Sequence, residues 1–350
     1  MFKLEKSHFA QLRALRETFL AKQSTGTVDY WGSTDILEAY DATLARRILW
    51  KWQSALSEAV NCGFANQTFH SIAQDLNSTT QELPANISEW VDWGCGTGVA
   101  TEALLECCLE HSFTLPLKII LYDRSLRAAT FAAKKLKKIY ADIQFLPTSI
   151  APDINHKGVL MSHVLSELPL AKYPEFIGKL SGASALLCVE AGTHDASHRL
   201  LQLRTLLHKE FHIWAPCPHQ NSCGLLKPEL EKEWCHQYAS VPNEIFQSAQ
   251  WNMIAKELEI DLRSLPYSML LMTRGTLENS QNENLTAENL YHRILGRPRH
   301  TKSQTQVWVC SKKEVCSKIL PVRNHKQFIK SLQKNNITEL ILDQEFNSEN

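Results

Sequence analysis

A glycine-rich turn is the first segment of this sequence whose residue types and spacing indicate ligand chemistry. It reads Asp-Trp-Gly-Cys-Gly-Thr-Gly over residues 92–98 and separates a short apolar run from a helical pattern at 99–109. Glycines let a strand turn sharply into a helix, and they let a ligand approach backbone N–H groups with no Cβ in the way. An acid at the end of the next apolar run could accept hydrogen bonds from ribose hydroxyls. The predicted nucleoside-binding residues are Asp92, Gly94, Cys95, Gly96, Gly98 and Asp123.

Four of the ten cysteines form a second candidate site. They are Cys217, Cys223, Cys235 and Cys310, of which the first three lie in a stretch rich in Pro and His. Thiolates are ligands for zinc and for iron–sulfur clusters, although this spacing differs from the paired cysteines of zinc fingers. Two alternatives stay open. The four could be buried free thiols, with His219 and His236 as surface residues, or Cys217 could be a nucleophile, because Ala-Pro-Cys is similar to the nucleophile segment of RNA cytosine-5 methyltransferases.

Strand and helix patterns alternate over the residues that must position both candidate sites. Strands are predicted at 89–92, 117–122, 158–164, 185–189, 211–214 and 267–272, and a helix at 125–140. Such alternation predicts a parallel sheet with helices on both faces. The carboxyl ends of the strands then meet along one edge, where ligands bind.

The two ends of the chain differ from this middle part. Apolar residues three and four positions apart predict one helix from Phe9 to Leu20 and another from Ile36 to Trp52, which Ser33 or Thr34 could cap. We therefore expect three parts. They are a helical N-terminal subdomain at 1–80, an α/β domain at 81–275 with a Cys-rich insertion at 215–240, and a polar connector with a small β-rich C-terminal unit, containing strands at 307–309 and 318–322, over 276–350.

Composition excludes several classes of protein. The 350 residues include 37 Lys+Arg and 37 Asp+Glu, so the formal net charge is zero and binding of nucleic acid through bulk charge is not expected. No apolar run approaches the ~20 residues of a membrane span, and the N-terminus lacks the apolar core of a secretion signal. We expect reduced cysteines and a cytoplasmic location in a bacterium, with an organelle matrix as the alternative. The oligomeric state is not predicted.

The glycine turn resembles motif I of the class I S-adenosylmethionine-dependent methyltransferases. The likeness consists of the opening Asp92, the string Trp-Gly-Cys-Gly-Thr-Gly and Asp123 at the end of the second strand. It implies a Rossmann-like α/β fold with S-adenosylmethionine as cofactor, its amino-acid end at Asp92 and the glycine loop, and its ribose at Asp123. A sheet that has lost its ligand site is the alternative. The Asn/Asp-Pro-Pro-aromatic string of amino-methylating enzymes is absent after the fourth strand, where His163 is a candidate base or a satisfied sheet-edge histidine, and Glu167 a candidate helix cap.

Several strings together resemble a narrower family. They are the glycine turn, His-Val-Leu-Ser-Glu-Leu at 163–168, Glu-Ala-Gly-Thr at 190–193, Ala-Pro-Cys-Pro-His at 215–219, Trp-Cys-His at 234–236 and Cys310. Over residues 30–325 the chain is similar to the methyltransferase-like proteins of the mitochondrial small ribosomal subunit (methyltransferase-like protein 17 type) and their bacterial relatives. The resemblance implies a four-iron, four-sulfur cluster held by Cys217, Cys223, Cys235 and Cys310, with zinc as the alternative. Ala191 departs from the family, which usually has Pro there.

The same resemblance implies a partner and a compartment. Members are assembly factors of the small ribosomal subunit that contact its ribosomal RNA, and a eukaryotic member would be in the mitochondrial matrix. Candidate RNA-contacting residues are Arg297, Arg299, His300 and Lys302, and a second basic run of Lys134, Lys135, Lys137 and Lys138, which could equally be a solvated helix face. Two further hypotheses are an active RNA methyltransferase and a zinc-stabilised, non-catalytic binding protein. No catalytic residue is assigned.

Overall fold

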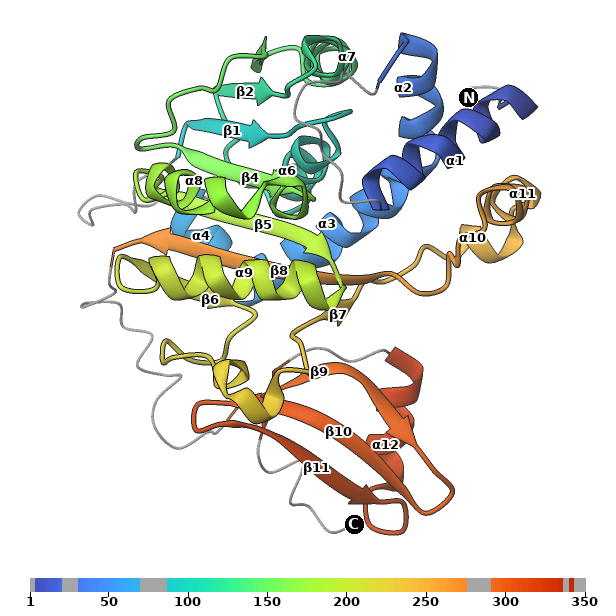
Figure 1. Cartoon of the computed structure of the whole chain (residues 1–350), viewed down its shortest axis with the longest axis vertical. Helices are drawn as coiled ribbons and strands as arrows, with labels where there is room; N and C mark the ends of the chain where they lie inside the picture. Colours follow the sequence, from blue (N-terminus) through green and yellow to red (C-terminus); the bar gives the residue numbers. More distant parts are fainter. Residues whose placement is uncertain (1–3, 21–30, 70–86, 276–290, 336–339, 343–350) are drawn as a thin grey trace.

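The computed structural model describes residues 4–20, 31–69, 87–275, 291–335 and 340–342. Within them the chain forms a central sheet of eight strands, with helices on both faces, and a separate sheet of four strands (Figure 1). The polar connector expected after residue 275 and the end of the expected N-terminal helical segment, 70–80, lie outside the described residues.

The central sheet has the order β3-β2-β1-β4-β5-β8-β6, with β7 paired to β8. Its strands are β1 (Glu89–Trp93), β2 (Lys118–Tyr122), β3 (Gln144–Thr148), β4 (Gly158–Ser162), β5 (Ala185–Ala191), β6 (Phe211–Ala215), β7 (Gln237–Tyr238) and β8 (Pro266–Arg274). Strands β1 to β5 pair in parallel, whereas β8 lies antiparallel between β5 and β6. The class I methyltransferase fold is thus confirmed. The parallel pairing expected from the alternation holds for β1 to β5. The antiparallel direction of β8 was not predicted, because an apolar run does not reveal the direction of its strand.

Helices cover both faces of this sheet. They are α1 (Lys6–Leu20), α2 (Thr34–Asp41), α3 (Leu44–Asn61), α4 (Phe64–Thr68), α6 (Val99–Glu110), α7 (Leu126–Lys137), α8 (Tyr173–Leu180), α9 (His194–Leu207), α10 (Glu244–Gln247) and α11 (Ala249–Leu258). One core joins α3, α6 and α7 to the sheet through Trp52, Leu104 and Leu136. The other face is covered by α8 and α9, which contribute Phe176 and Leu203 to a second core. Among the described helices none combines the length and apolarity that crossing a bilayer requires.

The expected helix from Ile36 to Trp52 is two helices. Ser33 caps α2 as predicted, since its Oγ accepts a hydrogen bond from the Ile36 N–H at 3.3 Å. The helix then stops near Thr43, whose backbone leaves the helical region (φ −130°, ψ −92°) and whose Oγ1 donates to the Ala39 carbonyl at 2.7 Å. A side chain that bonds to the backbone in this way competes with continuation of the helix.

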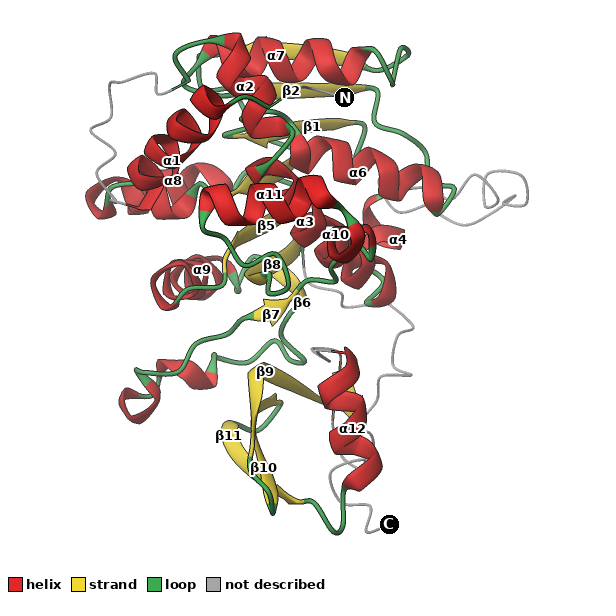
Figure 2. Ribbon diagram, turned by 90° about the vertical axis from the view of Figure 1, so that its right-hand side faces the viewer, coloured by secondary structure: helices red, strands yellow, loops and turns green. Residues whose placement is uncertain are grey.

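The second sheet lies beyond the edge of the first, as two perpendicular views show (Figures 1 and 2). It consists of β9 (Tyr291–His300), β10 (Gln304–Ser311), β11 (Val315–Pro321) and β12 (Leu340–Leu342), all paired antiparallel in the order β11-β10-β9-β12. Helix α12 (Lys326–Asn335) packs on it through Ile329 and Leu332, over a small core of its own. The strands expected at 307–309 and 318–322 fall in β10 and β11, while β9 was not predicted.

Candidate functional site

The glycine turn joins β1 to α6, and its three glycines have positive φ values. They are +77° at Gly94, +49° at Gly96 and +78° at Gly98. A Cβ on Gly94 would lie 2.7 Å from Cγ2 of Val164, so the close approach of the fourth strand's loop requires glycine there. A Cβ on Gly96 would meet the Trp31 ring at 3.8 Å, an ordinary van der Waals distance, so it is the positive φ and not a clash that favours glycine there.

Asp92, at the end of β1, is fully buried beneath the turn. Its Oδ2 accepts a hydrogen bond from the Thr101 Oγ1 at 2.7 Å, whereas Oδ1 has no partner among the described residues. Burial raises the pKa of Asp92 to about 7. Since buried polar atoms are normally paired, the unpaired oxygen fits a ligand that donates a hydrogen bond, such as the ammonium group of S-adenosylmethionine.

Asp123 follows β2 and is also buried, at 6% exposure. Its two oxygens accept hydrogen bonds from the backbone N–H groups of Gly96 (3.0 Å) and Ser125 (2.9 Å). The carboxylate therefore ties the turn to the start of α7, which Ser125 caps. A carboxylate has about four acceptor positions, and the contact of Asp123 with a ribose stays a prediction. Cys95 is buried in the same turn, and burial raises the pKa of its thiol.

A group of buried ionisable side chains lies at the carboxyl ends of β4 and β5. His163 has φ +56°, which ends β4 at Ser162, and its Nε2 has no partner among the described residues. The interpretation of His163 as a satisfied histidine is therefore not supported. Glu190, fully buried at the end of β5, accepts from the Leu165 N–H at 2.8 Å through Oε1, while Oε2 lacks a described partner. Burial raises the pKa of Glu190 to about 8.

Lys51 of α3 completes this group and was not predicted. Burial lowers its pKa to about 7, with Arg47 lowering it further and Glu190 opposing the shift. Burial, and then the charges of Lys51 and Arg47, hold the pKa of His163 well below its usual value. The only sequence signal for a buried Lys51 was its position among the apolar residues of the helix expected from Ile36 to Trp52. Glu167, the candidate helix cap, lies in a 3-10 turn, η1 (Leu165–Glu167), and pairs with Arg124 at 3.1 Å.

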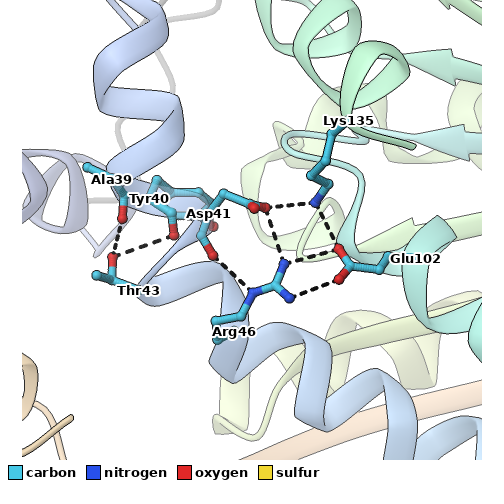
Figure 3. A network of polar contacts seen from close by, with 7 residues as sticks. All are labelled: Ala39, Tyr40, Asp41, Thr43, Arg46, Glu102 and Lys135. Carbon is cyan, nitrogen blue, oxygen red and sulfur yellow. Dashed lines mark hydrogen bonds and ion pairs between the residues drawn. The ribbon is translucent and has the colours of Figure 1, made fainter. Parts of the chain in front are cut away.

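A polar network fixes the helix that follows the glycine turn (Figure 3). Arg46 of α3 contacts both oxygens of Glu102 on α6, at 2.9 and 3.0 Å. Lys135 of α7 lies 2.8 Å from Glu102 and 2.8 Å from Asp41 at the end of α2. Lys135 is thus committed to the interior of the fold. Its neighbours Lys134, Lys137 and Lys138, also predicted as RNA contacts, are exposed.

The four predicted cysteines line one pocket of about 40 Å³, between the central sheet and the second sheet. Cys217 follows β6, Cys223 precedes the 3-10 turn η3 (Gly224–Leu226), Cys235 precedes β7, and Cys310 is on β10. Burial raises the pKa of Cys235 to about 12, and the neighbouring Cys217 and Cys223 add to the shift. The structure brings the four residues together; their role as ligands stays a prediction.

The two predicted metal centres make different demands on the four cysteines, and neither centre is shown by the described residues. Within the described part of the chain, no three His, Cys, Asp or Glu side chains are arranged to hold one metal ion. Tetrahedral zinc requires its sulfurs to be about 4 Å apart, given Zn–S bonds of about 2.3 Å. In a four-iron cluster each thiolate bonds a different iron, so the sulfurs stand farther apart. The pocket also exceeds the roughly 10–15 Å³ that one water needs.

The other predicted basic residues lie at the end of β9 and in the turn that follows. Arg297, Arg299, His300 and Lys302 are exposed. The guanidinium of Arg297 lies 4.4 Å from the centre of the Tyr238 ring and donates to Ser264 Oγ at 2.8 Å. His300 Nδ1 lies 2.9 Å from Thr305 Oγ1. These side chains are accessible to a partner, and their contact with RNA stays a prediction.

Comparison with known proteins gives one family. A family model described as mitochondrial small ribosomal subunit Rsm22 matches residues 57–336. The sequence matches no curated protein.

Among solved structures, three methyltransferases illustrate what the chain is similar to. Magnesium protoporphyrin IX methyltransferase from Synechocystis, with S-adenosylmethionine bound, is 12% identical over 79% of this chain and 100% of its own, with a TM-score of 0.36. The plantazolicin methyltransferase BpumL is 12% identical over 77% and 98%, with a TM-score of 0.36. A candidate RNA methyltransferase from Pyrococcus horikoshii is 10% identical over 54% and 75%, with a TM-score of 0.32.

Proposed function

The chain belongs to the Rsm22 family of the mitochondrial small ribosomal subunit, and from this premise we propose that it is a methyltransferase-like factor of ribosome assembly and translation. It acts with the small ribosomal subunit and its ribosomal RNA, binds S-adenosylmethionine at the glycine turn and holds an iron–sulfur cluster. It works in the bacterial cytoplasm, or in the mitochondrial matrix if the chain is eukaryotic. The observation that supports the proposal is that four cysteines from distant parts of the chain line one pocket between the central sheet and the second sheet.

S-adenosylmethionine, when bound, supplies an activated methyl group. In the proposal, the unpaired Oδ1 of Asp92 accepts a hydrogen bond from the ammonium group of this cofactor. The lack of a Cβ at Gly96 lets the cofactor approach the backbone, and Asp123 orients the ribose while holding the turn. Gly94, Cys95 and Gly98 give the loop its shape.

The metal part of the proposal assigns Cys217, Cys223, Cys235 and Cys310 as ligands of a four-iron, four-sulfur cluster. An all-sulfur donor set suits iron–sulfur clusters and zinc, and all four sulfurs belong to residues that line one pocket. Because the ligands come from β10 as well as from the insertion, the cluster joins the two sheets. Zinc in the same pocket is the alternative.

A second candidate function is an active RNA methyltransferase. The unpaired atoms of His163 and Glu190 at the carboxyl ends of β4 and β5 favour it, because methyl acceptors bind along that edge of the sheet. Transfer of a labelled methyl group to small-subunit RNA, lost in Asp92→Ala, is the expected result for an enzyme. Binding of the cofactor and the RNA with no transfer favours the non-catalytic factor.

Purification without oxygen tests the metal part. We expect brown protein with about four irons and four acid-labile sulfides per chain, reduced in Cys217→Ser. Cys316→Ser is the matched control, because Cys316 lies on the neighbouring strand β11 and does not line the pocket. Stoichiometric zinc without sulfide supports the alternative. Protein that contains neither iron nor zinc contradicts this part of the proposal.

Binding experiments test the other two parts separately. Titration with S-adenosylmethionine is expected to saturate one site. Sedimentation with isolated small subunits is expected to carry the protein with the particle, whereas large subunits serve as the control. Protein that stays in the supernatant with both particles contradicts the proposed partner.

A further inference from the structure

We propose that Arg204 and Arg293 are the counter-ions of the metal centre held by the four cysteines. Both side chains line the cysteine pocket and both are buried, with exposures of 3% and 2%. The inference rests on the metal part of the proposed function, and it concerns residues that the sequence did not single out.

Arg204, on α9, points its guanidinium at a thiol. Its Nε donates to Cys217 Sγ at 3.2 Å, and its Nη2 donates to the Asn221 carbonyl. Among the described residues no carboxylate lies within ion-pair distance of it. A buried charge with no opposite charge is strongly destabilising, so this guanidinium requires an anion in the pocket. Thiolates that bind a metal provide that anion.

Arg293, on β9, brings a second positive charge from the other sheet. It forms an ion pair with Glu58 of α3, which offsets part of its charge. Its side chain also lines the pocket that the four cysteines line. The two arginines therefore approach the cysteine pocket from opposite sides. Arg204 comes from α9, which packs on the central sheet, and Arg293 comes from β9 of the second sheet.

The charges of the centre match this arrangement. Four thiolates around a doubly positive core leave two net negative charges, whether the core is one zinc ion or an oxidised four-iron cluster. Such a centre is costly to bury alone, and hydrogen-bonded cations beside its sulfurs offset that cost. The proposal thus holds for either metal and predicts that charge at residue 204 controls how firmly the metal is held.

The test compares three variants of one helix. Arg204→Gln removes the charge at similar length, and Arg204→Lys keeps it. Arg199→Gln is the matched control, because Arg199 lies on the same helix and donates to the carbonyls of Leu165 and Leu168, outside the cysteine pocket. The measurement is the rate at which oxygen-free, full-length protein loses its iron or zinc to excess EDTA, with circular dichroism as the check of folding.

We expect Arg204→Gln to lose metal about tenfold faster than the parent, as for other residues that support metal ligands. Arg204→Lys should lie between the two, and Arg199→Gln should match the parent. Equal rates for Arg204→Gln and the parent overturn the proposal, and so do equal losses in Arg204→Gln and Arg204→Lys. A parent without iron or zinc overturns both this proposal and the metal part of the function, but leaves cofactor and subunit binding untouched.

Glu58→Gln provides a test that does not require a folded Arg204 variant. It removes the negative charge beside Arg293, so the counter-ion proposal predicts metal loss no faster than in the parent. If the pair serves only to join α3 to β9, the metal should instead be lost faster. That second result contradicts the proposal.

Discussion

At the scale of single residues, burial determines the protonation chemistry at the carboxyl ends of β1, β4 and β5, where the nucleoside site is proposed. Asp92, Glu190 and Lys51 all have pKa values moved toward neutrality, to about 7, about 8 and about 7, and desolvation is the largest cause in each case. Each side chain can therefore change its protonation state near neutral pH when a charged ligand arrives. Such shifts are common at functional sites, and they agree with the proposed binding of a zwitterionic cofactor at this edge.

Glu190→Gln is expected to weaken the loss of stability with rising pH. The folded protein keeps the Glu190 proton up to a pKa of about 8, whereas the unfolded chain releases it near the ordinary glutamate pKa of 4.5. The stability from this group is therefore fully present below about pH 4.5 and is lost as the pH rises through about 8. Glutamine keeps an oxygen for the Leu165 N–H but has no proton to release. Urea unfolding should show the parent losing a few kcal/mol more than the variant between about pH 5 and about pH 8; parallel curves would contradict this.

Asp92→Asn should weaken the binding of S-adenosylmethionine about tenfold or more, which corresponds to the roughly 1.5–3 kcal/mol of a hydrogen bond to a charged group. The reason is that asparagine has one acceptor oxygen, which Thr101 already occupies in the parent, where it bonds Oδ2. Isothermal titration measures the change. Gly178→Ala is the control, because Gly178 lies in α8 with open space around it. Unchanged affinity in Asp92→Asn would place the cofactor elsewhere.

At the scale of elements, the short break after α2 decides how the glycine turn is supported. Because the helix stops near Thr43 and restarts at Leu44, Arg46 enters α3 facing Glu102 of α6. Burial alone would raise the pKa of Glu102, but the hydrogen bond and charge of Arg46 and the charge of Lys135 lower it to about 2. The N-terminal helices therefore hold the first helix of the ligand-binding turn in place.

Glu102→Gln should destabilise the fold by about 3 kcal/mol, the usual effect of breaking a buried ion pair from one side. The stability that Glu102 contributes is present above its ordinary pKa of about 4.5 and is lost as the pH falls toward about 2, so the difference between parent and variant should shrink in acid. Chemical denaturation measures it. Glu89→Gln breaks the more exposed Lys118 pair and should change stability by less than about 1 kcal/mol. Similar effects in the two variants would mean that the network does not stabilise the fold.

At the scale of the whole molecule, the cysteine pocket lies at the seam between the two sheets. Apart from Cys310, the contacts across this seam include the Gly296 N–H to the His236 carbonyl at 3.0 Å and the Arg293–Glu58 ion pair. A Cβ on Gly296 would lie 2.5 Å from the His236 ring, so the two parts pack closely. The division into three domains, expected from the sequence, stays a prediction. The N-terminal helices share one hydrophobic core with the central sheet.

Removal of the proposed metal should loosen the second sheet and leave most of the first unchanged. The reason is that one ligand comes from β10 while the other three come from the insertion of the central sheet. Hydrogen exchange should speed up in β7, β9 and β10 after chelation and stay constant in β1 and β4. Cys310→Ser should reproduce the pattern without chelation, whereas Cys316→Ser should not. Uniform protection after chelation would show that the centre does not join the sheets.

The amino-acid sequence by itself determined the local features that depend on residue type. Glycines 94, 96 and 98 required positive φ values, Ser33 was suited to cap a helix, and apolar runs marked β1, β2, β5, β6 and β8. It did not reveal β3, because Pro147 and its exposed neighbours suit only the edge of a sheet, a position that exists once β2 is placed.

Tertiary structure alone decided which distant groups meet. Strand β8 runs antiparallel beside β5 and β6, and Arg204 and Arg293 line one pocket with the four cysteines. The fold also buries Lys51 beside Glu190 and leaves their charges without water. Local sequence patterns do not predict these contacts. Desolvation and charge pairing depend on all the elements that surround a side chain and not only on its neighbours along the chain.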